Sequence, residues 1–300
     1  MSDFTHGFWN WYISIITVVS ILGCGIFLWK LTTRKLAPGE KPGTMGHVWD
    51  GDLQEYNNPL PNWWRWLFYI TIVFALGYLA LYPGLGSFEG TLKWSSTGQY
   101  ESEMNAADEQ FGPVFRKFAA MDLTSVAGDP DALKIGENLF LNYCAQCHAS
   151  DARGSRGFPN LADNAWLYGG DPQTIKTTVL NGRNGIMPPM AAALPGEGVK
   201  DVAHYVMSLS GMTHDKLRST RGEPLFQTNC AVCHGVDGKG NQMLGAPNLT
   251  DDAWLYGQGE STIIETITNG RNGVMPAWGQ FLGEDKVHIL SAYVWSLSNR

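Results

Sequence analysis

The feature that most constrains this chain is an internal repeat in its C-terminal part. Residues Gly136 to Ser210 and Gly222 to Ser298 align with each other at offsets of 86 to 88 positions. Each copy opens with the same pentad, Cys-x-x-Cys-His, at residues 144–148 in the first copy and 230–234 in the second. The function of the repeated part therefore depends on what this pentad does.

The pentad has the spacing of covalent haem c attachment. Two thiols three positions apart can form thioethers with the two vinyl groups on one porphyrin edge, and the following histidine places an imidazole beneath the iron. A single pentad also fits half of a zinc site or a redox disulfide, but two pentads followed by the same Met-Pro segment favour haem. We expect two covalently bound haem c groups, with thioethers from Cys144, Cys147, Cys230 and Cys233 and axial imidazoles from His148 and His234.

A second motif, Asn-Gly-Arg-Asn-Gly-x-Met-Pro, occurs once in each copy and indicates the sixth iron ligand. Its Met187 and Met275 align with each other. A His/Met pair raises the reduction potential and closes the iron to small molecules, so the predicted chemistry is electron transfer. Met190 competes with Met187, but it aligns with Trp278 and is not favoured. Spacing leaves open whether each methionine serves the haem of its own copy or of the other.

Further pocket residues lie between pentad and methionine in each copy. The proline of a Pro-Asn-Leu segment can accept the free imidazole N–H through its carbonyl. The aromatic residues of an Ala-Trp-Leu-Tyr-Gly segment would wall the porphyrin, or simply fill the core, and an arginine can pair with a propionate. These candidates are Pro159, Trp166, Tyr168 and Arg183 in the first copy, and Pro247, Trp254, Tyr256 and Arg271 in the second.

The N-terminal part contains two runs without charge, Gly7 to Trp29 and Trp66 to Phe88, each beginning with aromatic residues. Both are long enough to cross a bilayer, and they predict a transmembrane helical hairpin with helices at about 8–29 and 63–82. A cleaved signal peptide is the alternative for the first run, but no Lys or Arg precedes it. The bias of basic residues toward the cytoplasm puts the connecting loop there and both ends of the hairpin outside. Those basic residues are Lys30, Arg34, Lys35, Lys41 and Arg65.

The sequence thus predicts an all-α chain in four parts. These are a transmembrane hairpin at 1–88, a linker with a helical segment at 89–130, and two tandem cytochrome c-like domains at 131–212 and 213–300. In the linker, Phe111, Val114, Phe115 and Phe118 share one helical face, and Gly112-Pro113 is expected to interrupt the helix.

Composition excludes one class of partner and favours another. The formal net charge is −7, and no basic stripe interleaved with aromatic residues appears, so nucleic-acid binding is not expected. An acidic surface would steer a basic redox protein toward the chain.

The hairpin, the loop sequence Gly-His-Val-Trp-Asp-Gly-Asp-Leu-Gln-Glu-Tyr-Asn-Asn-Pro-Leu-Pro at 46–61, and the two pentads together resemble the di-haem subunit (CcoP/FixP type) of bacterial cbb-type cytochrome c oxidase. The resemblance covers essentially the whole chain. It implies a location in the bacterial inner membrane with the haem domains in the periplasm. It also implies a haem-copper catalytic subunit and a mono-haem cytochrome c subunit as partners, with a soluble cytochrome c as electron donor.

Within such a complex this chain would be a non-catalytic electron-transfer subunit, since it has no cluster of membrane histidines to bind a second haem type and copper. The alternative is a free-standing, membrane-anchored di-haem electron carrier. A peroxidase or gas sensor would need an open iron, against which the two Met-Pro segments argue.

Overall fold

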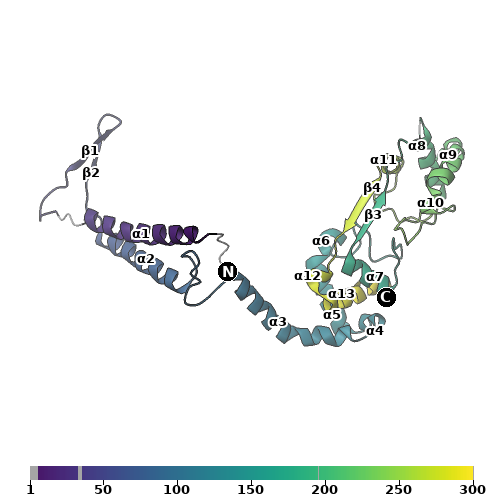
Figure 1. Ribbon diagram of the computed structural model, residues 1–300. Helices are drawn as coiled ribbons and strands as arrows, with labels where there is room; N and C mark the ends of the chain where they lie inside the picture. The colour runs from purple at the N-terminus through teal and green to yellow at the C-terminus, as the bar shows by residue number, and fades with distance from the viewer. Residues whose placement is uncertain (1–5, 33–35, 195, 300) are drawn as a thin grey trace. The chain divides into compact units, whose positions relative to one another are not determined.

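The computed structural model describes residues 6–32, 36–194 and 196–299, and it is mainly helical (Figure 1). The chain divides into two compact units, Met1–Ala107 and Asp108–Arg300. Four short strands form two separate two-stranded antiparallel sheets in the described residues. The expectation of an all-α fold is therefore corrected to a mainly helical one.

The first unit is built on two helices, α1 (Gly7–Thr32) and α2 (Asn62–Leu81), which lie side by side. Gly25 of α1 faces α2, since a Cβ at that position would make an ordinary contact of 3.4 Å with Ile72. Beyond the end of α2, the backbone N–H of Ser87 donates to the Asn10 side chain near the start of α1, so the two helices run antiparallel. Their connection contains a hairpin of β1 (Thr44–Trp49) and β2 (Leu53–Tyr56).

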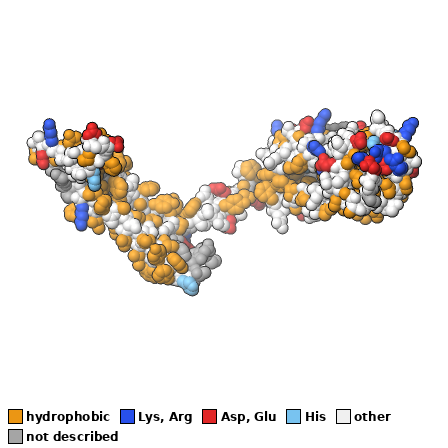
Figure 2. Space-filling model, turned by 90° about the horizontal axis from the view of Figure 1, so that it is seen from above, with side chains coloured by type: hydrophobic (Ala, Val, Ile, Leu, Met, Phe, Trp, Pro, Cys, Tyr) orange, Lys and Arg blue, Asp and Glu red, His pale blue; other side chains and the backbone are white. Residues whose placement is uncertain are grey.

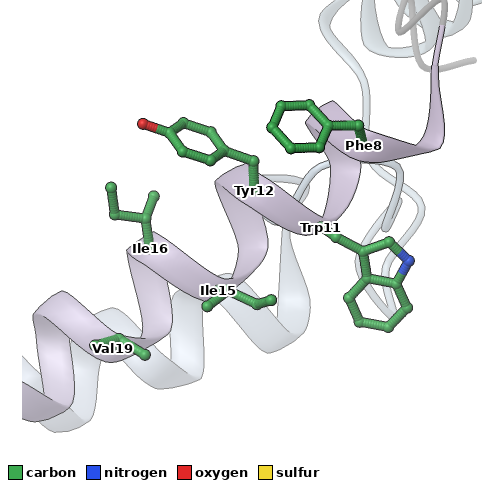
Figure 3. Close-up of a pocket in the computed structure, with 6 residues that line it drawn as sticks. All are labelled: Phe8, Trp11, Tyr12, Ile15, Ile16 and Val19. Carbon is green, nitrogen blue, oxygen red and sulfur yellow. The ribbon is translucent and has the colours of Figure 1, made fainter.

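Both helices are long and apolar enough to cross a membrane, yet almost none of their side chains is buried within the protein. Apolar side chains cover their outer surface (Figure 2). Figure 3 shows the outward face of α1, where aromatic side chains near the helix start give way to aliphatic ones: Phe8, Trp11, Tyr12, Ile15, Ile16 and Val19. A surface of this kind requires an apolar environment or a partner.

The linker forms one long helix, α3 (Ser96–Ala119), followed by the short α4 (Leu123–Ala127). The expected interruption at Gly112-Pro113 is absent, because α3 continues through Pro113. Proline in a helix interior removes one backbone donor, and here the carbonyl left free belongs to the exposed Glu109, where water can bind it. Asp122 caps α4 by accepting hydrogen bonds from the backbone N–H groups of Thr124 and Ser125.

The repeated part holds the remaining elements. The first copy contains α5 (Pro130–Tyr143), α6 (Ala145–His148), α7 (Pro172–Asn181), β3 (Arg183–Met187) and α8 (Gly198–Leu209). The second contains α9 (Lys216–Asn229), α10 (Ala231–His234), α11 (Glu260–Asn269), β4 (Arg271–Met275), α12 (Gly279–Leu282) and α13 (Glu284–Ser298).

The two copies exchange their closing helices. The closing helix of the second copy, α13, packs on α5 and α7 of the first copy, whereas α8 of the first copy packs on α9 and α11 of the second. The first core therefore joins Phe140, Ile175 and Val179 to Leu290 and Val294. The second core joins Val202 and Val206 to Phe226, Ile263 and Ile267. Each core thus draws on both repeats.

A glycine allows each exchanged helix to approach closely. A Cβ on Gly136 of α5 would lie 2.5 Å from Tyr293 Cβ of α13, and a Cβ on Gly222 of α9 would lie 2.0 Å from the Asp201 carbonyl oxygen of α8. Real side chains do not tolerate such distances. These two positions must therefore be glycine for the helices to cross as they do.

The crossing helices form two pairs, α5 with α13 (the first pair) and α8 with α9. The outer faces of these two pairs differ. On the first pair, Ala132, Ile289 and Ala292 are buried against Phe118 of α3 and Val126 of α4. The positions that correspond to them in the other pair are Arg218, Asp201 and His204.

These charged residues make ion pairs instead of an apolar contact. Asp201 accepts hydrogen bonds from Arg218 at 3.1 Å and from Arg221 at 2.8 and 2.9 Å. Figure 2 shows acidic and basic side chains gathered on this unit. The linker therefore covers one helix pair, and ion pairs join the helices of the other.

The strands that carry the two methionines pair with each other. Strands β3 and β4 are antiparallel, with Arg183 opposite Met275 and Met187 opposite Arg271. Further backbone hydrogen bonds cross between the copies, from Trp278 N–H to the Val179 carbonyl at 3.0 Å and from Met190 N–H to the Ile267 carbonyl at 2.9 Å. This ladder carries each Met segment into the opposite half of the unit.

Candidate haem-binding sites

Each pentad lies at the end of a helix that its own copy provides. The backbone N–H of Cys144 still bonds to Phe140, and α6 then forms a single turn in which the N–H of His148 bonds to the Cys144 carbonyl at 2.9 Å. The second pentad repeats this arrangement, with His234 N–H 3.0 Å from the Cys230 carbonyl. One turn of helix therefore holds the two thiols and the imidazole of each pentad together.

Both histidines are buried and oriented by a proline carbonyl. His148 Nδ1 lies 3.0 Å from the Pro159 carbonyl oxygen, and His234 Nδ1 lies 3.2 Å from that of Pro247, the contact that the sequence predicted. Burial lowers the pKa of both imidazoles, and this effect is larger than the rise caused by the hydrogen bond to the proline carbonyl. The rings are thus neutral at pH 7, and with Nδ1–H donating, Nε2 presents its lone pair to a metal.

Burial keeps the first thiol of each pentad protonated when no group is bound. Burial raises the pKa of Cys144 to about 11, with the neighbouring Cys147 adding to the effect, and it raises that of Cys230 similarly. A structural zinc site requires thiolates and four ligands. Among the residues that the structure describes, no group of three or more His, Cys, Asp or Glu side chains is placed to hold a metal ion.

Each methionine packs in the core opposite to its own copy's pentad. Met275 of the second copy packs against the first core, as does Cys144. Met187 of the first copy packs against the second core together with Met190 and Cys230. Each methionine is thus packed in the core that holds the first cysteine of the other copy's pentad.

The arginines of the two Met motifs are held in equivalent ways. Arg183 stacks on the Tyr168 ring, 4.8 Å from its centroid, and donates from Nε to Thr178 Oγ1 at 2.9 Å. Arg271 stacks on Tyr256 at 4.4 Å and donates to Thr266 Oγ1 at 3.0 and 2.8 Å.

The sequence did not single out the two threonines that hold these arginines. Their signal was available, because each lies five residues before its arginine in both copies.

Three buried side-chain polar atoms lack a partner in the described part of the chain: His288 Nδ1 on α13 and two atoms near the pentads. Trp254 Nε1 and the Tyr168 hydroxyl have no hydrogen-bond acceptor in the described part of the chain. Such groups are costly unless something binds them, and both are donors that suit a carboxylate. Haem propionates are carboxylates, so these orphaned donors, the neutral imidazoles and the flanking arginines fit haem c.

The candidate residues thus fall into two groups. Cys144, Trp166 and Met275 pack against the first core, next to the turn that holds Cys147 and His148 and to the Pro159 carbonyl. Arg183 stacks on Tyr168, which also lies beside Gly245 of the second copy. Cys230, Trp254 and Met187 pack against the second core, next to the turn that holds Cys233 and His234 and to the Pro247 carbonyl. Arg271 stacks on Tyr256, which lies beside Gly157 of the first copy, so both tyrosines contact the opposite copy.

Comparison with known proteins gives matches along the chain. The family model described as cytochrome c oxidase, cbb3-type, subunit III matches residues 131–206 and 218–294. The model for the N-terminal domain of cytochrome oxidase-cbb3, FixP, matches residues 41–89.

Named relatives include the cbb3-type cytochrome c oxidase subunit CcoP of Rubrivivax gelatinosus, 52% identical over 99% of this chain and 97% of the relative. CcoP of Cereibacter sphaeroides is 41% identical over 88% of this chain and 97% of its own length. FixP of Azorhizobium caulinodans is 40% identical, with 85% and 93% covered.

Proposed function

Because the chain belongs to the CcoP/FixP family, subunit III of cbb3-type cytochrome c oxidase, and is thus a membrane-anchored electron-transfer subunit, we propose a specific route for its electrons. A soluble cytochrome c in the periplasm donates them, and the repeated part passes them toward the haem-copper catalytic subunit, with a mono-haem cytochrome c subunit in the same complex. This subunit itself does not reduce oxygen.

Two covalently bound haem c groups account for the residues present. When bound, haem c supplies an iron that alternates between ferrous and ferric states and so carries one electron at a time. Cys144 and Cys147 hold one group, and Cys230 and Cys233 hold the other. The proline carbonyls fix the tautomer of His148, and likewise that of His234, so that each imidazole is ready to bind iron without rearrangement.

The observation that carries the proposal in detail is the exchange of methionines. Since Met275 packs with Cys144 and Met187 packs with Cys230, we assign Met275 to the iron of the first pentad and Met187 to that of the second. Both loops end in a proline, and the pairing of β3 with β4 restrains them further. The surrounding aromatic residues exclude water, which favours outer-sphere electron transfer over ligand chemistry.

The proposed topology follows from the apolar helices. Residues 1–88 would anchor the chain through α1 and α2 in the bacterial inner membrane, and 89–130 would link this anchor to the haem-binding repeats at 131–300. Lys30, Lys41 and Arg65 flank or lie in the connection between the helices, which supports a cytoplasmic loop. The repeats would then be periplasmic, where haem c attachment takes place in bacteria.

The methionine assignment is tested in a chain that carries a single haem. Cys230→Ala with Cys233→Ala removes attachment at the second pentad. In this background Met275→Ala should lower the reduction potential of the remaining haem and allow it to bind carbon monoxide, whereas Met187→Ala should leave both unchanged. The opposite result would assign each methionine to its own repeat.

The oxidase assignment is tested by purification from membranes in mild detergent. We expect two haem c per chain, and co-purification with the catalytic and mono-haem subunits. A chain with two haems that purifies alone under these conditions would instead be the free-standing carrier.

A further inference from the structure

The arginines of the two Met motifs, Arg183 and Arg271, differ in one contact. Arg271 Nη1, at the start of β4, lies 3.0 Å from Oε1 of Glu265, six residues earlier on α11. The residue at the corresponding position of the first copy is Thr177, whose hydroxyl donates to the Gln173 carbonyl of its own helix at 2.9 Å. Among the described residues, Arg183 has no carboxylate within ion-pair distance.

Glu265 also forms an ion pair with an arginine of the other repeat. Arg156, in the loop that follows the first pentad, places Nη2 at 3.6 Å from Glu265 Oε2. The Arg271 side chain is only 20% exposed, against 66% for Arg156. The charge of Glu265 therefore acts mainly on the partly buried guanidinium beside Tyr256, where water screens it least.

A fixed charge near an iron changes its reduction potential in a known direction. A guanidinium favours the ferrous state, because that state carries one positive charge less, and a carboxylate favours the ferric state. From the unequal pairing of Arg271 and Arg183 we propose that Glu265 lowers the reduction potential of the haem bound at the second pentad relative to that at the first. The inference rests on the proposed function.

The unequal pairing gives the electron path a direction. An electron moves spontaneously from the site of lower potential to the site of higher potential. The charge of Glu265 therefore favours transfer from the second haem to the first, although the two sites are otherwise built from the same residue types. Glu265 is a positioning and tuning residue in this scheme and touches no reacting atom.

The effect of charge can be separated from loss of structure at this site. Thr266 holds Arg271 by two hydrogen bonds that do not involve Glu265. Glu265 is about half exposed and belongs to neither core. Replacement of Glu265 by glutamine keeps the size of the side chain and an oxygen for Arg271, and removes only the charge.

The test is an optical redox titration of the full-length chain carrying both haems. The wave of the second haem is identified as the one that disappears in the Cys230→Ala, Cys233→Ala variant. Glu265→Gln should raise the midpoint potential of this wave by the equivalent of about a tenfold change in the reduction equilibrium constant. The midpoint potential of the other wave should not change. An unmoved or lowered wave would overturn the proposal.

Two further variants make the test specific. Glu260→Gln removes the same charge from the start of α11, where the carboxylate lies 3.4 Å from His204. This variant should shift the midpoint potential of the second wave much less than Glu265→Gln does. An equal shift would reject a local effect of Glu265. Thr177→Glu supplies the missing carboxylate beside Arg183 and should lower the first wave. If it moves neither wave, pairing of the arginine does not set the potential.

Haem content separates this inference from the function on which it rests. Two haems per chain and unchanged absorption of Met-ligated ferric haem are measured for every variant before titration. A wild-type chain without two haems refutes the proposed function, whereas two intact haems with an unmoved wave refute only the role of Glu265.

Discussion

Replacement of Gly222 by alanine tests the exchange of closing helices most directly. Gly222 lies in α9 where α8 crosses it, and a Cβ there would lie 2.0 Å from the Asp201 carbonyl oxygen and 3.0 Å from Tyr205 Cβ. Ordinary contact begins at 3.4 Å, so the helices would have to separate by about 1.4 Å. Because the obstacle is backbone, no change of rotamer can relieve it.

The expected loss of stability follows from two opposing effects. Overpacking of a close contact costs about 1–3 kcal/mol, and a clash with backbone belongs at the upper end of this range. Alanine recovers about 1 kcal/mol of helix propensity relative to glycine. We therefore expect Gly222→Ala to lower the free energy of unfolding of the haem-binding unit by about 2 kcal/mol.

The assay is equilibrium urea unfolding of the haem-loaded chain in detergent, followed by haem absorption. Gly198→Ala is the matched control, because it lies in α8 and its Cβ would meet Leu225 at an ordinary 3.4 Å. The control should unfold at the wild-type urea concentration or above. Should Gly222→Ala be as stable as the control, α8 does not cross α9 as described, and the exchanged packing is refuted.

Two further predictions concern the outer faces of the helix pairs. The hydrogen bond from Arg221 holds the pKa of Asp201 below its ordinary 3.8, so the ion pair stabilises the fold above that pH and is lost as the pH falls through the folded-state pKa. Asp201→Asn should thus cost about 2 kcal/mol at pH 7, with a difference from wild type that shrinks in urea titrations below about pH 4; a difference independent of pH would contradict this. Ile289→Asp places a charge at a fully buried site under α4 and should lower the free energy of unfolding by about 4 kcal/mol or more. The control Ile289→Val should lower it by about 1 kcal/mol. Protease cleavage near residue 120 should become rapid only in the aspartate variant.

The thiol and imidazole residues of the sites could be predicted from the sequence because they lie close together along the chain. The pentads specify two thiols and an imidazole within one helical turn, and the proline that orients each imidazole follows 11 or 13 residues later. Long runs of apolar residues likewise predicted the two helices of the first unit. In each case the interacting residues are near in sequence, so spacing suffices.

The exchange of segments could not be derived in this way. Each repeat contains a closing helix of the same pattern, so α8 and α13 fit the glycine of either α5 or α9 almost equally well as sequences. One signal was present: Asp201 matches Arg218 and Arg221 in charge, whereas Ile289 matches the apolar Ala132. Compared across the repeats, these residues pair α8 with α9 and α13 with α5.

In the linker, the local rule that a Gly-Pro pair interrupts a helix gave a wrong prediction. Gly112-Pro113 predicts a break, but Phe115 and Phe118 of the same helix pack beneath α13 and against α4. Burial of two aromatic side chains is worth several kcal/mol, comparable to the cost of about 3 kcal/mol for an internal proline. Tertiary packing thus decides the course of α3.

The ladder between β3 and β4 also bears on how such a chain can evolve. Loss of either copy would deprive the other of a strand neighbour, a helix across its core and a methionine packed in that core. A truncated gene would therefore encode an incomplete core. The two copies therefore depend on each other for their packing as the subunits of an obligate dimer do, although one polypeptide carries both.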